Sequence, residues 1–163
     1  MFALGLAVRW LHLAASLVLV GATALMLLAG RSDRPTALGW ERRMLVRSRA
    51  LAALALVSGV ALLLFQTAIL EGRAVAVFDP AALGRVLFET QGGRVWLVRH
   101  GLLLLLAAFL SVRWGVDERA DWRAARGEAL LLGAVALVFV GAAGHAAAVE
   151  PGAVLAIAVD GVH

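Results

Sequence analysis

The stretch 50–70, ALAALALVSGVALLLFQTAIL, contains no charged residue and decides the fold. A helix needs about 20 apolar residues to cross the roughly 30 Å hydrocarbon core of a bilayer, and this stretch is long enough. It lacks the alternation of apolar and polar residues that a strand of a membrane barrel requires. Backbone polar groups in lipid must be satisfied within their own segment or within a closed barrel. We therefore predict a membrane-spanning helix here.

Three more stretches have the length and composition of membrane helices, at about 3–30, 95–112 and 129–149. After the turn at Pro151-Gly152 a new apolar run starts at about residue 153, and it is too short to span a bilayer. We read this run as the start of a fifth helix in a fragment of a longer protein; the alternative is a re-entrant end. The prediction is an all-α, polytopic membrane helix bundle that forms a single domain over residues 1–163.

The composition excludes several classes of protein. Apolar residues make up 63% of the chain and charged residues 16%, against about 25% charged residues in soluble domains. Cysteine is absent, which removes disulfides and thiolate ligands. The sequence contains no nucleophile elbow, HExxH motif, P-loop or dinucleotide fingerprint. We therefore predict a membrane protein that is not an enzyme.

The distribution of arginine predicts the orientation in the membrane. All 15 basic residues are arginine; six lie in the link 31–49 and four in the link 113–128. The link 71–94 has three, and the tail from Glu150 has none. Because cytoplasmic loops carry the excess of basic residues, the first and third links are predicted to be cytoplasmic and the N-terminus periplasmic. This pattern accounts for the net charge, so we expect the lipid bilayer, and no nucleic acid, as a partner.

The link 71–94 contains signals for a short helix. Asp79-Pro80 is typical of an N-cap followed by the first helical residue. Ala82, Leu83, Val86 and Leu87 then fall on one face, and Gly92-Gly93 would end the run. A plain connector is the alternative.

Ionisable side chains inside a membrane span are costly unless they face the interior of the bundle. In the first predicted helix Arg9, His12, Ser16 and Thr23 are spaced so that they share one face. We expect this stripe to face other helices. His12 is either a ligand-binding residue or a hydrogen-bond partner of a neighbouring helix, while Arg9 has the alternative of snorkelling to the headgroups.

The other three histidines are predicted to lie in the same, outer half of the bilayer as His12. His100 follows Arg99 in the third helix, and His145 lies among small residues at the end of the fourth. His163 follows Asp160 by three residues, a spacing at which a carboxylate could orient an imidazole bound to a metal. Imidazole suits copper, zinc, nickel and haem iron, so these histidines are candidate ligands; ordinary interhelical hydrogen bonding is the alternative.

Four motifs resemble the copper resistance D (CopD) family of bacterial inner-membrane proteins. RWLHLAASLVLVGATAL at 9–25 is similar to the first helix of the family, and GGRVWLVRHGLLLLL at 92–106 is similar to its Gly-Arg-x-Trp segment. GHAAA at 144–148 and DGVH at 160–163 resemble its Gly-His-Ala and Asp-x-x-His segments. These motifs sample nearly the whole chain.

The resemblance implies copper transport or handling across the bacterial inner membrane, with a role in copper resistance or acquisition. Mapped by motif, it points to His12, His145 and His163 as metal ligands, to Asp160 as a residue that orients one of them, and to His100 as a weaker candidate. A periplasmic copper-binding protein is a partner compatible with this function. A b-type haem-binding membrane electron carrier is the alternative, since paired histidines on facing helices can hold haem.

Overall fold

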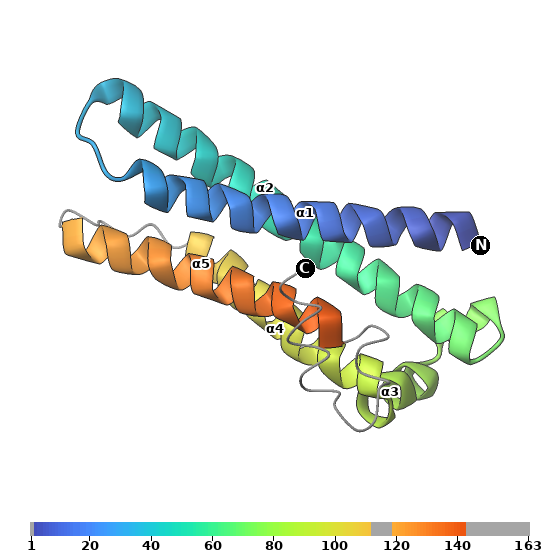
Figure 1. Ribbon diagram of the computed structural model, residues 1–163. Coiled ribbons are helices and arrows are strands. Elements are labelled where there is room, and N and C mark those ends of the chain that lie inside the picture. Colours follow the sequence, from blue (N-terminus) through green and yellow to red (C-terminus); the bar gives the residue numbers. More distant parts are fainter. Residues whose placement is uncertain (1, 112–118, 143–163) are drawn as a thin grey trace.

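The computed structural model describes residues 2–111 and 119–142, and every regular element in these ranges is helical. Four long helices lie alongside one another, and the short α3 packs at the end of the bundle near the N-terminus (Figure 1). The elements are α1 (Phe2–Ala29), α2 (Pro35–Leu70), the 3-10 helix η1 (Ala74–Phe78), α3 (Pro80–Glu89), α4 (Gln91–Ser111) and α5 (Arg119–Ala142).

Three of the described helices are long and apolar enough to cross a membrane. They are Ala3–Ala29, Pro35–Leu70 and Gln91–Ser111. The all-α fold is therefore confirmed, and each of the first three predicted spans lies in a helix of sufficient length and hydropathy. The fourth predicted span, 129–149, runs beyond Ala142, and the predicted fifth helix lies wholly outside the described residues.

The second helix starts much earlier than predicted. α2 runs for 36 residues from Pro35, with this proline in its first turn, so it is about 54 Å long at 1.5 Å per residue. The predicted loop 31–49 is mostly helix, because Glu, Arg, Met and Leu are good helix formers whether or not lipid surrounds them. Gly30 (φ 72°) and Gly72 (φ 66°) adopt left-handed backbone conformations just after α1 and α2, which glycine favours.

Two side chains of α2, those of Glu41 and Arg49, hold the part of α2 that precedes residue 50 against α5 and α4. Glu41 Oε1 accepts hydrogen bonds from Trp122 Nε1 (2.6 Å) and Arg126 Nη2 (2.7 Å) on α5. Arg49 Nε donates to the carbonyl of Leu110 (2.6 Å), in the last turn of α4. α5 begins at Arg119, so the mixed-charge residues 119–128 before the fourth predicted span are helical.

The predicted short helix is confirmed as α3, and the alternative of a plain connector is wrong. The Asp79 side chain accepts from the backbone N–H groups of Ala81 and Ala82, and Ala82 and Val86 are buried. Gly92-Gly93 does not end a helix; it lies in the first turn of α4. A Cβ atom on Gly93 would overlap the backbone of Val86 and Leu87, so the corner between α3 and α4 requires glycine.

Asp79→Ala is expected to loosen α3. The hydrogen bond from the Ala82 N–H, then the one from Arg73, lowers the pKa of Asp79 below its ordinary value of 3.8. A carboxylate with a lowered pKa stabilises the fold at neutral pH, and this contribution is lost as pH falls below that ordinary value. Hydrogen exchange of the amides in 81–89 should rise at pH 7 in Asp79→Ala, while exchange in α1 stays unchanged. Unchanged exchange in α3 would show that the cap does not hold this helix.

The bundle interior is built from small residues and leucines. One buried cluster contains Leu19, Ala52, Leu106, Leu110 and Ala129, and small residues at such positions allow helices in a membrane to approach closely. Many leucines and valines outside the interior are exposed, as expected for surfaces that face lipid.

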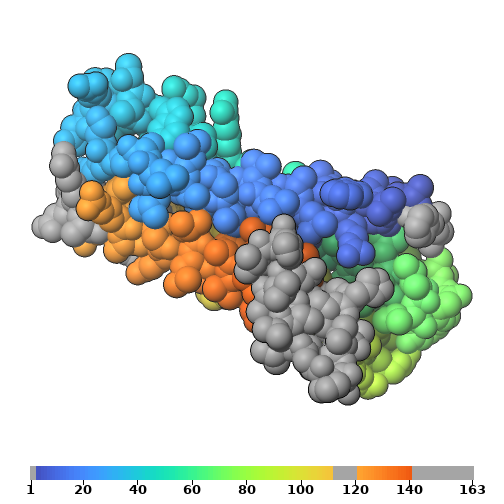
Figure 2. All heavy atoms as spheres, in the orientation of Figure 1, coloured from blue at the N-terminus to red at the C-terminus, as the bar shows by residue number. Residues whose placement is uncertain are grey.

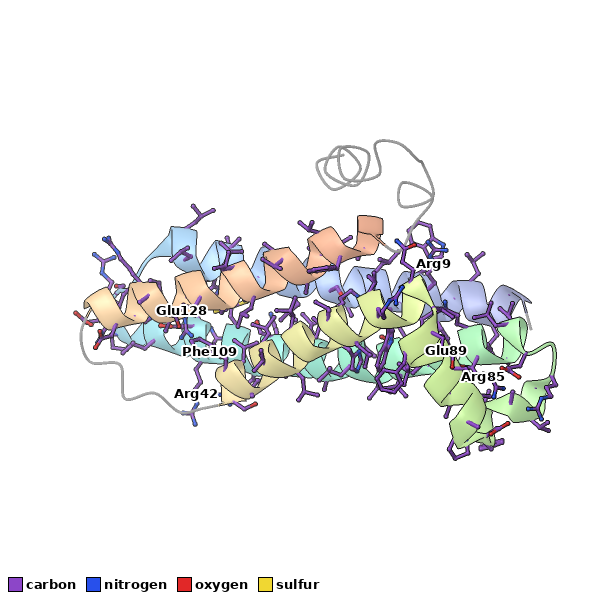
Figure 3. The ribbon with its side chains drawn as sticks, turned by 90° about the horizontal axis from the view of Figure 1, so that it is seen from below. Arg9, Arg42, Arg85, Glu89, Phe109 and Glu128 are labelled. Atoms are coloured by element: carbon purple, nitrogen blue, oxygen red, sulfur yellow. The ribbon has the colours of Figure 1, made fainter. Side chains whose placement is uncertain are left out.

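α1 and α5 lie side by side on the face shown in Figure 2. Charged side chains gather toward the two ends of the bundle, Arg42 and Glu128 at one end and Arg85 and Glu89 at the other (Figure 3).

Candidate metal site

His12 is buried between α1 and α2, with 1% of its surface exposed. Its Nδ1 atom lies 2.9 Å from the carbonyl oxygen of Ala55 and 3.2 Å from Ser58 Oγ, both on α2. A carbonyl oxygen can only accept, so Nδ1 carries the hydrogen and donates it. In the neutral ring Nε2 then bears a lone pair, and this buried atom has no hydrogen-bond partner among the described residues. The helix pair thus presents one imidazole nitrogen that is free to bind a ligand.

Ser58 is the second contact of the His12 ring on α2. Its hydroxyl donates to the carbonyl of Leu54 (2.6 Å), one turn earlier in α2, which leaves an oxygen lone pair directed away from that bond. That lone pair can accept from the His12 Nδ1–H group. The structure thus gives Ser58 a contact with a candidate ligand.

Gly59 lets two imidazoles approach the same point on α2. A Cβ atom built on Gly59 would lie 2.8 Å from Cε1 and 2.9 Å from Nδ1 of His100, and 3.2 Å from Cε1 of His12. Real Cβ atoms do not approach other atoms at the first two distances. Only glycine therefore leaves room for both rings, and His100 Nδ1, like His12 Nε2, is buried without a partner among the described residues.

Trp96 fixes the position of His100. Its ring stacks on the His100 ring, with centroids 4.2 Å apart and planes 13° apart. Its Nε1–H group donates to the carbonyl of Gly59 (2.8 Å). Trp96 thus joins α4 to α2 at the glycine that both histidines approach.

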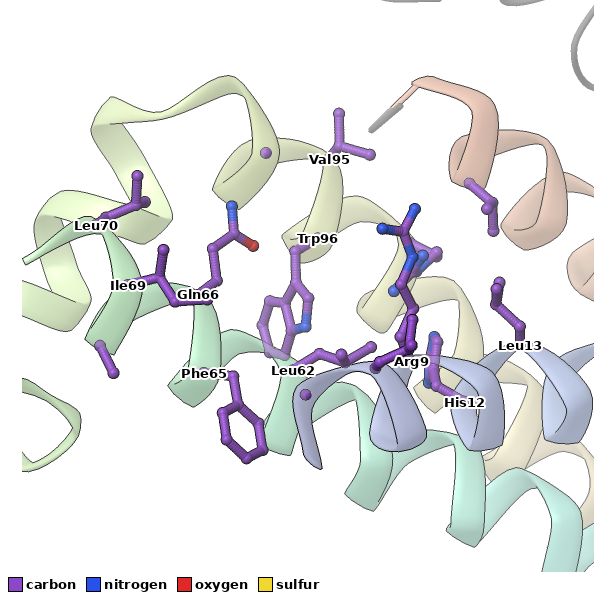
Figure 4. Close-up of a pocket in the computed structure, with 16 residues that line it drawn as sticks. Arg9, His12, Leu13, Leu62, Phe65, Gln66, Ile69, Leu70, Val95 and Trp96 are labelled. Carbon is purple, nitrogen blue, oxygen red and sulfur yellow. The ribbon is translucent and has the colours of Figure 1, made fainter. Parts of the chain in front are cut away.

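A cavity of about 740 Å³ opens beside His12. Most of its lining is apolar, and it comes from α1, α2, α4 and Val140 of α5. The polar side chains that line it are those of Arg9, His12, Gln66 and Trp96, which Figure 4 labels, and that of Arg99. The adjacent residues Arg99 and His100 both point into the bundle: Arg99 lines the cavity, and His100 packs on Gly59.

The structure brings together two of the five predicted site residues. His12 and His100 meet at Gly59, whereas His145, Asp160 and His163 lie outside the described residues. Of the predicted stripe, His12, Ser16 and Thr23 are buried, and Arg9 is exposed and lines the cavity. Within 2–111 and 119–142, no group of three or more His, Cys, Asp or Glu side chains could hold a metal ion.

Sequence reasoning missed Gly59 and the structural role of Trp96. A glycine within an uninterrupted apolar helix is a signal for close helix approach, so Gly59 could have been noted. Its partners could not be, because they depend on how α2 crosses α1 and α4.

Long apolar helices and paired imidazoles inside the bundle define a multi-pass helical membrane protein with a candidate metal site. The family model for the copper resistance protein D-like, N-terminal domain matches residues 1–155, and the chain belongs to this family. Membership gives the chain a copper-related membrane function. Comparisons with curated proteins and with solved structures gave no match.

Proposed function

We propose that the protein transports or handles copper across the bacterial inner membrane, and so contributes to copper resistance or acquisition. The observation that carries this proposal is the His12 ring, whose Nδ1–H group donates to the Ala55 carbonyl while the buried Nε2 atom has no partner among residues 2–111 and 119–142. Histidines that bind metals usually donate their other ring N–H in this way, often to a backbone carbonyl. Copper is the cargo that family membership favours.

The proposed site extends beyond His12. His100 approaches the same glycine and is a second candidate ligand. His145 and His163 are proposed as further ligands, with Asp160 orienting one of them. Support for His145 comes from the resemblance of GHAAA at 144–148 to the Gly-His-Ala segment of the family.

The orientation and the partner belong to the same proposal. The N-terminus is proposed to lie in the periplasm, because the two arginine-rich links are then cytoplasmic, as the positive-inside rule requires. The end of the bundle that holds His12, His100 and α3 would then be the periplasmic end, where a copper-binding protein could deliver or accept the metal. The proposed role is capture and passage of an ion, not catalysis.

A b-type haem is the alternative ligand, and the cavity beside His12 is the observation that supports this alternative. The cavity is largely apolar, and His12 borders it together with two arginines that could contact acidic substituents. Haem iron accepts imidazole as an axial ligand.

Elemental analysis of the whole protein, purified in detergent and incubated with copper, tests the proposal. We expect stoichiometric copper and no iron. Stoichiometric iron with a haem absorption band would replace copper handling by haem binding. If neither metal is retained and cells lacking the protein take up and tolerate copper normally, the proposed function is wrong.

A further inference from the structure

Two arginines and no acid line the cavity beside His12 in the part of the chain that the structure describes. They are Arg9 and Arg99, and none of the described lining residues is Asp or Glu. Among the described residues neither guanidinium has an ion-pair partner, and each repels the other. Charged side chains within a membrane are costly unless they are paired, so we expect a negative group from outside the described bundle to bind near these two arginines.

One atom of Arg99 also lacks a hydrogen-bond partner among the described residues. Its Nε–H group is buried and has no hydrogen-bond partner among the described residues. Buried donors in folded proteins are nearly always satisfied, by protein, by water or by a ligand. Gln66 adds a side-chain amide to the lining, so the polar part of the cavity is rich in donors.

The remainder of the cavity suits a hydrocarbon chain. Leu62, Phe65, Ile69 and Val95 line it, and Ile69 is 76% exposed on the surface of α2. Three of the helices that line the cavity, α1, α2 and α4, are long and apolar enough to cross a membrane. A ligand with an acidic head and an apolar tail matches both parts.

We propose that this cavity binds an anionic phospholipid, with the phosphate between Arg9 and Arg99 and an acyl chain along the apolar lining. Guanidinium groups bind phosphate oxygens through paired, charge-assisted hydrogen bonds. Basic pockets between membrane helices are known to bind acidic lipid headgroups. The bound phosphate would offset the positive charge beside His12. The proposal does not depend on copper binding.

Native mass spectrometry of the whole protein in a mild detergent tests this site, with phosphatidylglycerol or phosphatidylcholine added as probes. We expect phosphatidylglycerol to remain bound and phosphatidylcholine to dissociate. Arg99→Gln and Arg9→Gln should each weaken phosphatidylglycerol binding by about tenfold, the effect of losing one charge-assisted contact. Arg94→Gln is the matched control, because Arg94 is exposed on the same helix as Arg99 and does not line the cavity.

Further arms keep the test decisive. Arg99→Lys keeps the positive charge, so it should bind more phosphatidylglycerol than Arg99→Gln does. Arg9→Gln guards against a disturbed fold, because Arg9 is exposed and its replacement leaves the packing intact. Equal retention of the two lipids, or unchanged binding in both Arg→Gln variants, would overturn the proposal. Full competition by millimolar inorganic phosphate would also overturn it, since the ligand would then be a free anion.

Discussion

Replacing His12 with asparagine is expected to abolish copper binding by the whole protein. The asparagine amide can place an N–H group near the position of Nδ1 and keep the bond to the Ala55 carbonyl, but it has no counterpart of the Nε2 lone pair. Loss of only an outer hydrogen-bond partner of a metal ligand costs about 10–100-fold in affinity, so loss of the ligand should cost at least about 100-fold. Isothermal titration with copper in detergent measures this change.

Thr23→Val is the matched control for this variant. Thr23 is buried on the same helix, and among the residues that the structure describes its hydroxyl bonds only within that helix, to the Val20 carbonyl. Thr23→Val should leave the copper affinity unchanged. If His12→Asn is folded and binds copper as tightly as the unmodified protein, His12 is an interhelical hydrogen-bonding residue and not a ligand.

Gly59→Ala is expected to weaken copper binding by at least about tenfold while both histidines remain in place. The new methyl group would lie 2.8 Å from His100 and 3.2 Å from His12, so one or both rings must move. Overpacking of this kind costs about 1–3 kcal/mol, and a displacement of ligands that costs about 1.4 kcal/mol already lowers affinity tenfold. Copper titration and thermal unfolding of the same sample measure the two effects together.

Gly101→Ala provides the comparison, because a Cβ atom at Gly101 meets no atom of the described residues within 4 Å. It should change neither copper affinity nor thermal stability by much. If Gly59→Ala lowers the unfolding temperature but leaves copper affinity intact, the contact with His100 matters for packing alone and His100 is not part of the site.

The sequence predicted the helices better than their ends. Hydropathy identified the apolar part of α2, since the length of a span follows from the thickness of the bilayer. It could not show that α2 begins at Pro35, because a helix that leaves the membrane needs helix-forming residues rather than apolar ones. The N-cap at Asp79 was predictable, because its hydrogen bonds are made within a few residues of it.

The candidate site was only partly predictable, for a related reason. His12 could be found because a histidine in an apolar helix is unusual wherever its partners lie. The shared approach of His12 and His100 to Gly59 depends on the crossing of three helices, which no local pattern contains. The contact of Trp96 with the Gly59 carbonyl has the same origin; the residue was predictable as part of a membrane helix, but its partner was not.

The pairing of His12 with α2 has a consequence for the order of events during synthesis. The partners of His12 Nδ1 lie in the next helix of the chain, whereas Trp96 follows its own partner, Gly59, by 37 residues. At about 5–20 residues per second, those residues take the ribosome about 2–7 s to add. We expect the first helical hairpin to close in that interval, so that His12 is oriented before the segment carrying His100 leaves the ribosome.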